Sequence, residues 1–148
     1  MLERAGVTVR TYGNGWPNGR ISVEQMPKLF AASKIVLGCG TIGYCHDFFA
    51  LKMRDFDAAM SGSMYVTHAN PDLAPLFREG AEIVTCKELP QLVESVRHYL
   101  KAEAEREQIA AAGALRARRE HSWDARFELM LRRLSALPGV SLKRERHA

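Results

Sequence analysis

Short apolar runs alternate with segments of helical periodicity over the first two thirds of the chain. The apolar runs are rich in Val, Ile, Tyr and Thr and are bounded by turn or cap residues, a pattern that predicts strands. The segments between them repeat apolar residues at helical spacing. Because helices separate the strands, we expect crossover connections and a parallel sheet. The predicted strands span residues 7–13, 34–39, 64–69 and 82–86.

Cap and turn residues predict where the intervening helices begin and end. Ser22 and Gln25 have the spacing of a capping box. Gly62 and Gly80 occupy positions typical of the glycine that follows a helix. The predicted helices span residues 23–33, 53–61 and 72–79.

The last third of the chain predicts three consecutive helices. The first, over 88–100, places leucine, valine and tyrosine side chains on one face, which we expect to pack against the sheet. Two more are predicted over 103–122 and 123–137, with a break near residues 121–122. Trp123 is expected to anchor the last helix in the core.

Together these elements predict an α/β fold. We expect a Rossmann-like parallel sheet of about four strands with flanking helices and two or three C-terminal helices. This domain spans residues 1–137, and residues 138–148 form a polar tail.

Composition excludes several classes of protein. The 148 residues are 47% hydrophobic and 26% charged, as in globular proteins that fold in water. No run of about 18 apolar residues predicts a transmembrane segment, and the first residues lack an apolar signal core, so we expect a cytoplasmic protein. The three cysteines lack the spacing of a metal site, which favours free thiols over zinc binding.

The net charge of +4 is unevenly distributed. Residues 1–96 contain nine Lys and Arg against ten Asp and Glu, whereas residues 97–148 contain twelve against seven. In the C-terminal helices the arginines are interleaved with acidic residues, as on a solvated helix face. Since no nucleic-acid recognition motif accompanies them, we expect no nucleic-acid binding.

The segment GCGTIG, residues 38–43, is the first candidate for ligand chemistry. Gly38, Gly40 and Gly43 form a G-x-G-x-x-G pattern after a predicted strand, and Asp57 lies nineteen residues after Gly38. This is the pattern of an NAD(P)-type dinucleotide-binding module, although its acid normally ends the next strand and Asp57 lies within a predicted helix. Two interpretations of this segment therefore remain: a dinucleotide-binding site, or a glycine-rich loop before a helix that could hold any phosphate.

Five segments in order resemble the C-terminal, donor-binding half of GT-B glycosyltransferases. The resemblance is strongest to glycosyl transferases group 1, in the branch of spore-maturation glycosyltransferase-like proteins, and runs from about residue 2 to residue 131. The segments are VTVRTYGNGW, GRISVEQMPKLFAASKIVLG, LKMRDFDAAMSGSMYVT, LAPLFREGAEIVTCKELPQLVESVRHYL and EREQIAAAGALRARREHSWDARFELML.

The resemblance implies roles in binding a nucleotide-sugar. Asp57 takes the place of the family's acid, usually glutamate, which accepts hydrogen bonds from the ribose hydroxyls. The loop around Ile21 would hold the base, and Arg54 could pair with a phosphate. The glycine-rich loop from Gly38 to Gly43 and the helix start after it would face the diphosphate and the sugar.

The donor-sugar contact cannot be carried over directly. Related enzymes have a second glutamate eight residues before the first, where this chain has Phe49. His46 is a nearby polar candidate, since histidine can exchange protons near neutral pH. No catalytic residue is assigned.

GT-B enzymes act in a cleft between two domains, so the resemblance implies at most half of an active site. We expect an acceptor domain or a partner chain to supply the other half, for an unknown acceptor, with no metal or cofactor required. The resemblance also implies a strand before residues 1–6, which we expect this sequence to lack, so we expect self-association or a partner chain to cover a sheet edge. A non-catalytic interaction domain is the further alternative.

Overall fold

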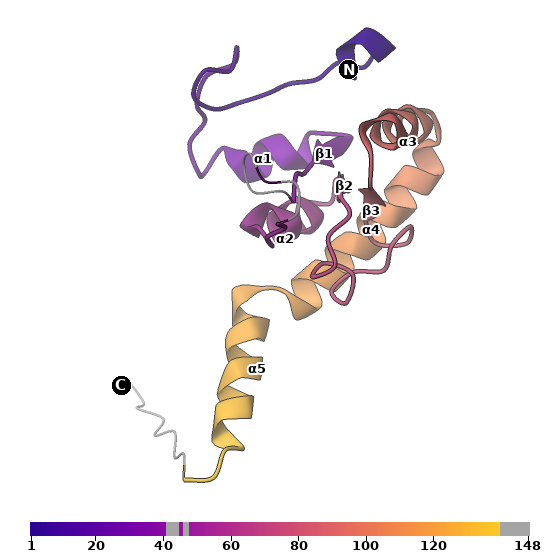
Figure 1. Cartoon of the computed structure of the whole chain (residues 1–148). Helices are drawn as coiled ribbons and strands as arrows, with labels where there is room; N and C mark the ends of the chain where they lie inside the picture. Colours follow the sequence, from indigo (N-terminus) through magenta and orange to yellow (C-terminus); the bar gives the residue numbers. More distant parts are fainter. Residues whose placement is uncertain (41–44, 46–47, 140–148) are drawn as a thin grey trace.

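The computed structural model describes residues 1–40, 45 and 48–139. Among them lie three strands and six helices, whose arrangement Figure 1 shows. The strands are β1 (Ile35–Leu37), β2 (Met64–His68) and β3 (Val84–Cys86). The helices are η1 (Glu3–Ala5, a 3-10 helix), α1 (Met26–Ala31), α2 (Met53–Met60), α3 (Leu89–Lys101), α4 (Glu103–Glu120) and α5 (Trp123–Ser135).

The strands form one parallel sheet in the order β1-β2-β3. Val36 lies opposite Tyr65, and Val66 lies opposite Val84. Of the two connections between strands, the one from β1 to β2 contains α2 and the one from β2 to β3 contains turns without a helix. The predicted α/β class with a parallel sheet is confirmed.

Helices cover both faces of the sheet. Tyr65 packs in a core cluster with residues of α2 and the C-terminal half of α4. Its neighbours Met64 and Val66 point to the opposite face and pack with residues of α3 and the N-terminal half of α4. Because successive side chains of a strand alternate between faces, β2 lies buried at the centre of the domain.

The strand predicted over 7–13 does not form. These residues have no regular secondary structure, and β1 pairs only with β2, so the described sheet has three strands and not about four. A run of β-branched residues becomes a strand only when a neighbouring strand completes its hydrogen bonds, and none lies beside it here.

The helix predicted over 72–79 is also wrong, since hydrogen-bonded turns replace it. The Leu73 N–H donates to the Asn70 carbonyl at 3.0 Å and the Phe77 N–H to the Leu73 carbonyl at 3.2 Å. Pro75 has no N–H, and its ring would clash with a helical carbonyl four residues earlier, so the turns cannot continue as a helix.

Two predicted signals are present, although α1 begins at Met26, three residues later than predicted. The Ser22 N–H donates to Gln25 Oε1 at 3.0 Å and the Gln25 N–H donates to Ser22 Oγ at 3.3 Å, which is a capping box. Gly62 follows α2 with a φ of 86°, a conformation that glycine adopts without steric cost.

Helix α2 is held at both ends by side chains. At its start, the Asp55 carboxylate accepts hydrogen bonds from the Lys52 N–H at 2.6 Å and from the Tyr65 hydroxyl at 2.6 Å. At its end, the Arg118 guanidinium of α4 donates twice to the Met60 carbonyl, at 2.7 and 3.1 Å. These contacts fix the helix that contains Arg54 and Asp57.

Helix α4 approaches the sheet very closely at Gly113. A Cβ at this position would lie 2.2 Å from the Glu82 carbonyl oxygen. Only glycine lets the helix lie this close to the start of β3.

Helix α5 extends away from the rest of the domain (Figure 1). None of its residues is buried, and Trp123 is 65% exposed, so the prediction that Trp123 anchors a core is wrong. The break before α5 lies at residues 121–122, as predicted. Among the described residues, no helix is both long and apolar enough to cross a membrane.

Candidate functional site

The carboxyl ends of β1 and β2 meet the start of α2 at one edge of the sheet. The Gly38 N–H continues the ladder by donating to the Val66 carbonyl at 2.8 Å. Lys52 Nζ, just before α2, donates to the Cys39 carbonyl at 2.8 Å. Open parallel sheets bind ligands at this edge, so the residues gathered here form the candidate site.

Gly38 lies against the side chains of β2. A Cβ at Gly38 would lie 1.8 Å from Tyr65 Oη and 2.6 Å from Thr67 Oγ1. The first glycine of the G-x-G-x-x-G pattern is therefore required by packing, because no side chain fits between β1 and the Tyr65 hydroxyl.

Gly40 is buried but less crowded. A Cβ there would be 3.7 Å from the Asn70 side chain and 3.8 Å from the Phe49 ring, which are ordinary contacts. Its carbonyl accepts a hydrogen bond from the Ala50 N–H at 2.9 Å. Gly43 and His46 lie outside the described residues.

Asp55 is the acid at this edge that the sequence did not single out as a site residue. Its side chain is buried and accepts from both Tyr65 and Lys52. Burial, followed by the hydrogen bond to Asp55, raises the pKa of the Tyr65 hydroxyl, which therefore stays protonated and donates to the carboxylate. An acid three residues after the start of a helix is the signal that could have indicated this structural role.

Asp57 and Arg54 lie on the side of α2 that faces away from the core. Asp57 is half-buried and Arg54 is exposed, and neither forms a hydrogen bond or an ion pair with any described residue. Burial raises the pKa of the Asp57 carboxyl, because no donor compensates the lost hydration of its charge. The two carboxylates of α2 therefore differ: Asp55 is fully paired, and Asp57 is free to accept donors.

Ile21 lies in the segment before α1, after a turn closed by the Gly13 N–H donating to the Gly19 carbonyl at 2.7 Å. Its side chain is half-buried. Within the described part of the chain no hydrogen bond links it to Asp57 or to the glycine-rich loop. The structure thus brings Gly38, Gly40 and the start of α2 together and leaves Ile21 outside this group of contacts.

Two polar atoms at the end of β2 have no hydrogen-bond partner among the described residues. They are Thr67 Oγ1 and His68 Nδ1, both buried. The His68 ring stacks on Phe49 with centroids 5.1 Å apart. Thr67 was not singled out from the sequence, because an alternating strand pattern does not show which hydroxyl lacks a partner.

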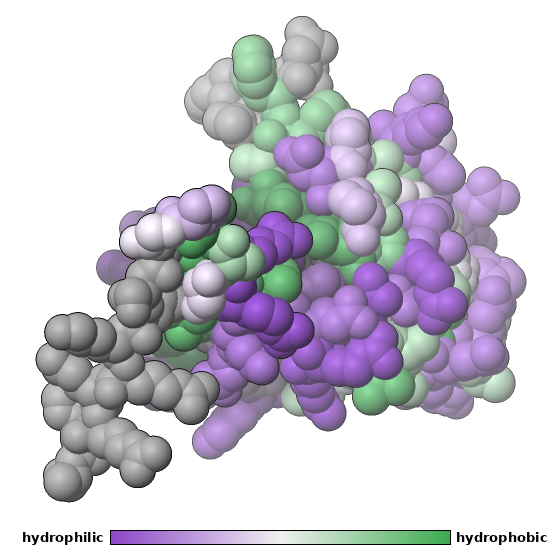
Figure 2. Space-filling model, turned by 90° about the horizontal axis from the view of Figure 1, so that it is seen from below, coloured by the Kyte–Doolittle hydropathy of each residue, from purple (hydrophilic) through white to green (hydrophobic). Residues whose placement is uncertain are grey.

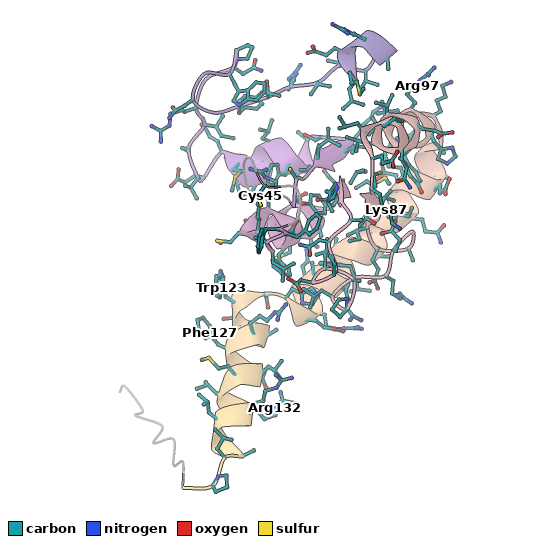
Figure 3. The ribbon with its side chains drawn as sticks, viewed as in Figure 1. Cys45, Lys87, Arg97, Trp123, Phe127 and Arg132 are labelled. Carbon is teal, nitrogen blue, oxygen red and sulfur yellow. The ribbon has the colours of Figure 1, made fainter. Side chains whose placement is uncertain are left out.

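Two surface hollows lie away from this edge. One, of about 690 Å³, lies between Met1 and the outer face of α3 near Arg97, which Figure 3 labels. The other, of about 360 Å³, lies along α5. No group of three or more His, Cys, Asp or Glu side chains placed to hold a metal ion occurs in the described part of the chain.

Comparison with known proteins gives one family and one fold. The model of the family described as "Glycosyl transferase-like" matches residues 1–132. Among solved structures, the chain resembles sucrose-phosphate synthase (tll1590) from Thermosynechococcus elongatus, with a TM-score of 0.61 and 15% sequence identity. No curated protein matches the chain.

The structural match covers 80% of this chain but only 29% of the synthase chain. At this identity the likeness shows the fold, which is the Rossmann-like fold of GT-B proteins, and no more. The family match extends over most of the sequence, including the strands, α2 and the whole candidate edge. The chain therefore belongs to the glycosyl transferase-like family.

Proposed function

We propose that the carboxyl edge of the sheet binds the nucleoside diphosphate part of a nucleotide-sugar, as the donor side of a glycosyltransferase. The observation that carries this proposal is the Asp57 carboxylate, which is half-buried without a partner in the described structure. An incompletely paired carboxylate at a ligand-binding edge is a candidate for ligand contact, because a bound donor would compensate its desolvation.

Asp57 suits a ribose. Its two oxygens can accept from two neighbouring hydroxyl groups at once, and hydrogen bonds to a charged acceptor are among the stronger ones in proteins. The aspartate is one methylene shorter than the glutamate usual in the resembling family, so the ribose would lie closer to the α2 backbone.

Arg54 is the proposed phosphate contact. It is exposed, lies one turn before Asp57 and has no acidic partner among the described residues. The Asp55 carboxylate already lies at the start of α2, and its negative charge offsets the positive end of the helix dipole. The dipole alone therefore attracts a bound phosphate less strongly. The guanidinium therefore supplies the positive charge that a diphosphate leaving group needs.

The acceptor side would come from a further domain or from a partner chain. The contacts that the structure describes bring together residues at one edge of one sheet, namely Gly38, Gly40 and the start of α2. The chain spans 29% of the length of the synthase it resembles. Transfer without a metal stays part of this proposal, with Arg54 and the loop N–H groups offsetting the leaving-group charge.

Titration calorimetry with UDP, GDP and NAD tests the proposal. We expect one nucleoside diphosphate to bind, and Asp57→Asn to weaken it by about 1–3 kcal/mol, the value of a hydrogen bond to a charged group. Asp124→Asn is the control, since it removes the same charge from α5 and not from α2. Circular dichroism confirms that both variants are folded.

Two results would contradict the proposal. Binding of NAD but of neither nucleoside diphosphate would indicate the dinucleotide-binding module that the G-x-G-x-x-G pattern also allows. Equal loss of affinity in both variants would show that Asp57 acts only through general electrostatics.

A further inference from the structure

Polar atoms without partners are a more specific sign of a ligand than surface hydropathy. Hydrophilic residues cover most of the face seen from below, with apolar residues among them (Figure 2). Three buried side-chain atoms of the described residues form no hydrogen bond: Thr67 Oγ1, His68 Nδ1 and Arg116 Nε.

Of these three atoms, His68 Nδ1 has the fewest polar contacts. Arg116 Nε is paired with a Glu120 carboxylate oxygen at 3.0 Å. Thr67 Oγ1 has the Tyr65 hydroxyl as a neighbour, since both border the same point at Gly38. The described structure contains no hydrogen bond or ion pair of His68.

His68 ends β2, the central strand, at the carboxyl edge of the sheet. It lies beside Cys86, the last residue of β3. Its ring stacks on Phe49, with centroids 5.1 Å apart and planes inclined by 14°. The Phe49 ring in turn lies 3.8 Å from the position of a Cβ on Gly40. The imidazole is therefore held by its face beside the candidate site, and the nitrogens at its edge have no partner.

The burial of Nδ1 determines which nitrogen carries the hydrogen of the neutral ring. A hydrogen on Nδ1 would be a buried donor without an acceptor, which proteins avoid more strictly than a buried acceptor without a donor. The favoured tautomer therefore has its hydrogen on Nε2. The His68 side chain is only half-buried, so a ligand at the edge can reach the ring.

His68 and Asp57 lie on opposite sides of the sheet. The His68 side chain shares the face of Met64 and Val66, because side chains alternate along a strand, whereas α2 packs on the face of Tyr65. A ligand that contacts both His68 and Asp57 has to cross the carboxyl edge between them. In a nucleotide-sugar the diphosphate follows the ribose, so with the ribose at Asp57 the diphosphate is the part that crosses.

We propose that the Nε2–H of His68 donates a hydrogen bond to the sugar-bearing phosphate of the bound nucleotide-sugar. This contact rests on the proposed function of the edge as a nucleoside diphosphate site. Arg54, on α2 with Asp57, pairs with the phosphate next to the ribose, and His68 reaches the second phosphate. A hydrogen bond to a charged phosphate oxygen is stronger than one between neutral groups. The contact therefore makes the site selective for a diphosphate over a monophosphate.

Titration calorimetry with the diphosphate and the monophosphate of the same nucleoside tests this contact. His68→Phe keeps a ring that can stack on Phe49 and removes both nitrogens. We expect it to weaken binding of UDP or GDP, whichever the original chain binds, by about 10-fold, and of the matching monophosphate by less than about 2-fold. His68→Gln, whose amide N–H can replace Nε2–H, should recover part of the lost affinity.

His98→Phe is the control for these variants. His98 lies on α3, where its ring is paired with Glu105 at 2.8 Å, so its replacement should change neither affinity. Circular dichroism checks that each variant is folded.

Nitrogen-15 NMR of the original chain, labelled at histidine, tests the tautomer without relying on any variant's affinity. We expect the neutral His68 ring to carry its hydrogen on Nε2 and the diphosphate to shift that signal, which is assigned by its loss in His68→Phe or His68→Gln. A hydrogen on Nδ1, an unshifted Nε2 signal, or equal losses of diphosphate and monophosphate affinity would overturn the contact while the site at Asp57 stands. If neither UDP nor GDP binds the original chain, the proposed function itself fails, and the contact with it.

Discussion

Replacing Gly38 with alanine should destabilise the fold strongly. The added Cβ would lie 1.8 Å from Tyr65 Oη and 2.5 Å from Tyr65 Cζ, so the phenol ring has to move. That movement breaks its hydrogen bond to the buried Asp55 carboxylate. Overpacking costs about 1–3 kcal/mol and the lost charged hydrogen bond about 1.5–3, so we expect a loss of about 3–5 kcal/mol in the free energy of unfolding.

Gly40→Ala is the matched control for this substitution. Among the described residues its Cβ would meet nothing closer than 3.7 Å, and neither Gly38 nor Gly40 has a positive φ that alanine would disfavour. We expect Gly40→Ala to change the free energy of unfolding by less than about 1 kcal/mol. The two glycines of one sequence motif should therefore differ widely in their effect on stability.

Urea denaturation measures both variants. With m values of about 1–3 kcal/mol/M, Gly38→Ala should lower the midpoint by at least about 1 M without changing the slope. In the Tyr65→Phe background its cost should shrink, because the same hydrogen bond is already lost. If Gly38→Ala costs no more than Gly40→Ala, the Tyr65 hydroxyl does not explain why position 38 is glycine.

Two other substitutions test the described contacts. Burial raises the pKa of the Asp57 carboxyl, so the free energy of unfolding falls as the pH rises and this group loses its proton. Asp57→Asn should therefore be as stable as the original protein at about pH 3, where the carboxyl is protonated. At pH 7 the variant should be more stable by up to about 0.5 kcal/mol, after allowing for solvent screening. Chemical denaturation at the two pH values checks this, and a variant less stable at pH 7 contradicts it. Gly113→Ala should lose about 2 kcal/mol or more although alanine favours helices, since its Cβ would lie 2.2 Å from the Glu82 carbonyl oxygen; a raised melting temperature would show that α4 can move aside.

The fold could be predicted where a local signal and its neighbours agree. The strands at β1, β2 and β3, the capping box at Ser22 and the glycine after α2 all combine a sequence pattern with a matching environment. Residues 7–13 have the pattern of a strand but no strand to pair with, and the helix over 72–79 fails because Pro75 interrupts its hydrogen bonds. The position of Trp123 at the start of a helix likewise suggests a core anchor, but no local pattern shows that α5 extends away from the core and leaves this side chain exposed.

The candidate site was predicted only in part. The sequence predicted Gly38, Gly40 and the start of α2 as parts of one site, and the structure places them at one edge of the sheet. The structure adds a packing reason for Gly38, and the phosphate role of the glycines stays a prediction. The reason for Gly38 depends on Tyr65, twenty-seven residues later, which no local pattern reveals. The different roles of Asp55 and Asp57 likewise depend on Tyr65 of β2, which donates a hydrogen bond to Asp55.

The anchoring of α2 at both ends has a consequence for any ligand at Asp57. The helix keeps its place without the ligand, because Tyr65 and Arg118 hold it from two other elements. Binding would then order little of the protein, and most of the entropy lost would be that of the ligand itself. Affinity at such a site depends on residues that never touch the ligand: a change at Arg118 would tilt α2 and move the carboxylate while every contacting side chain stays the same.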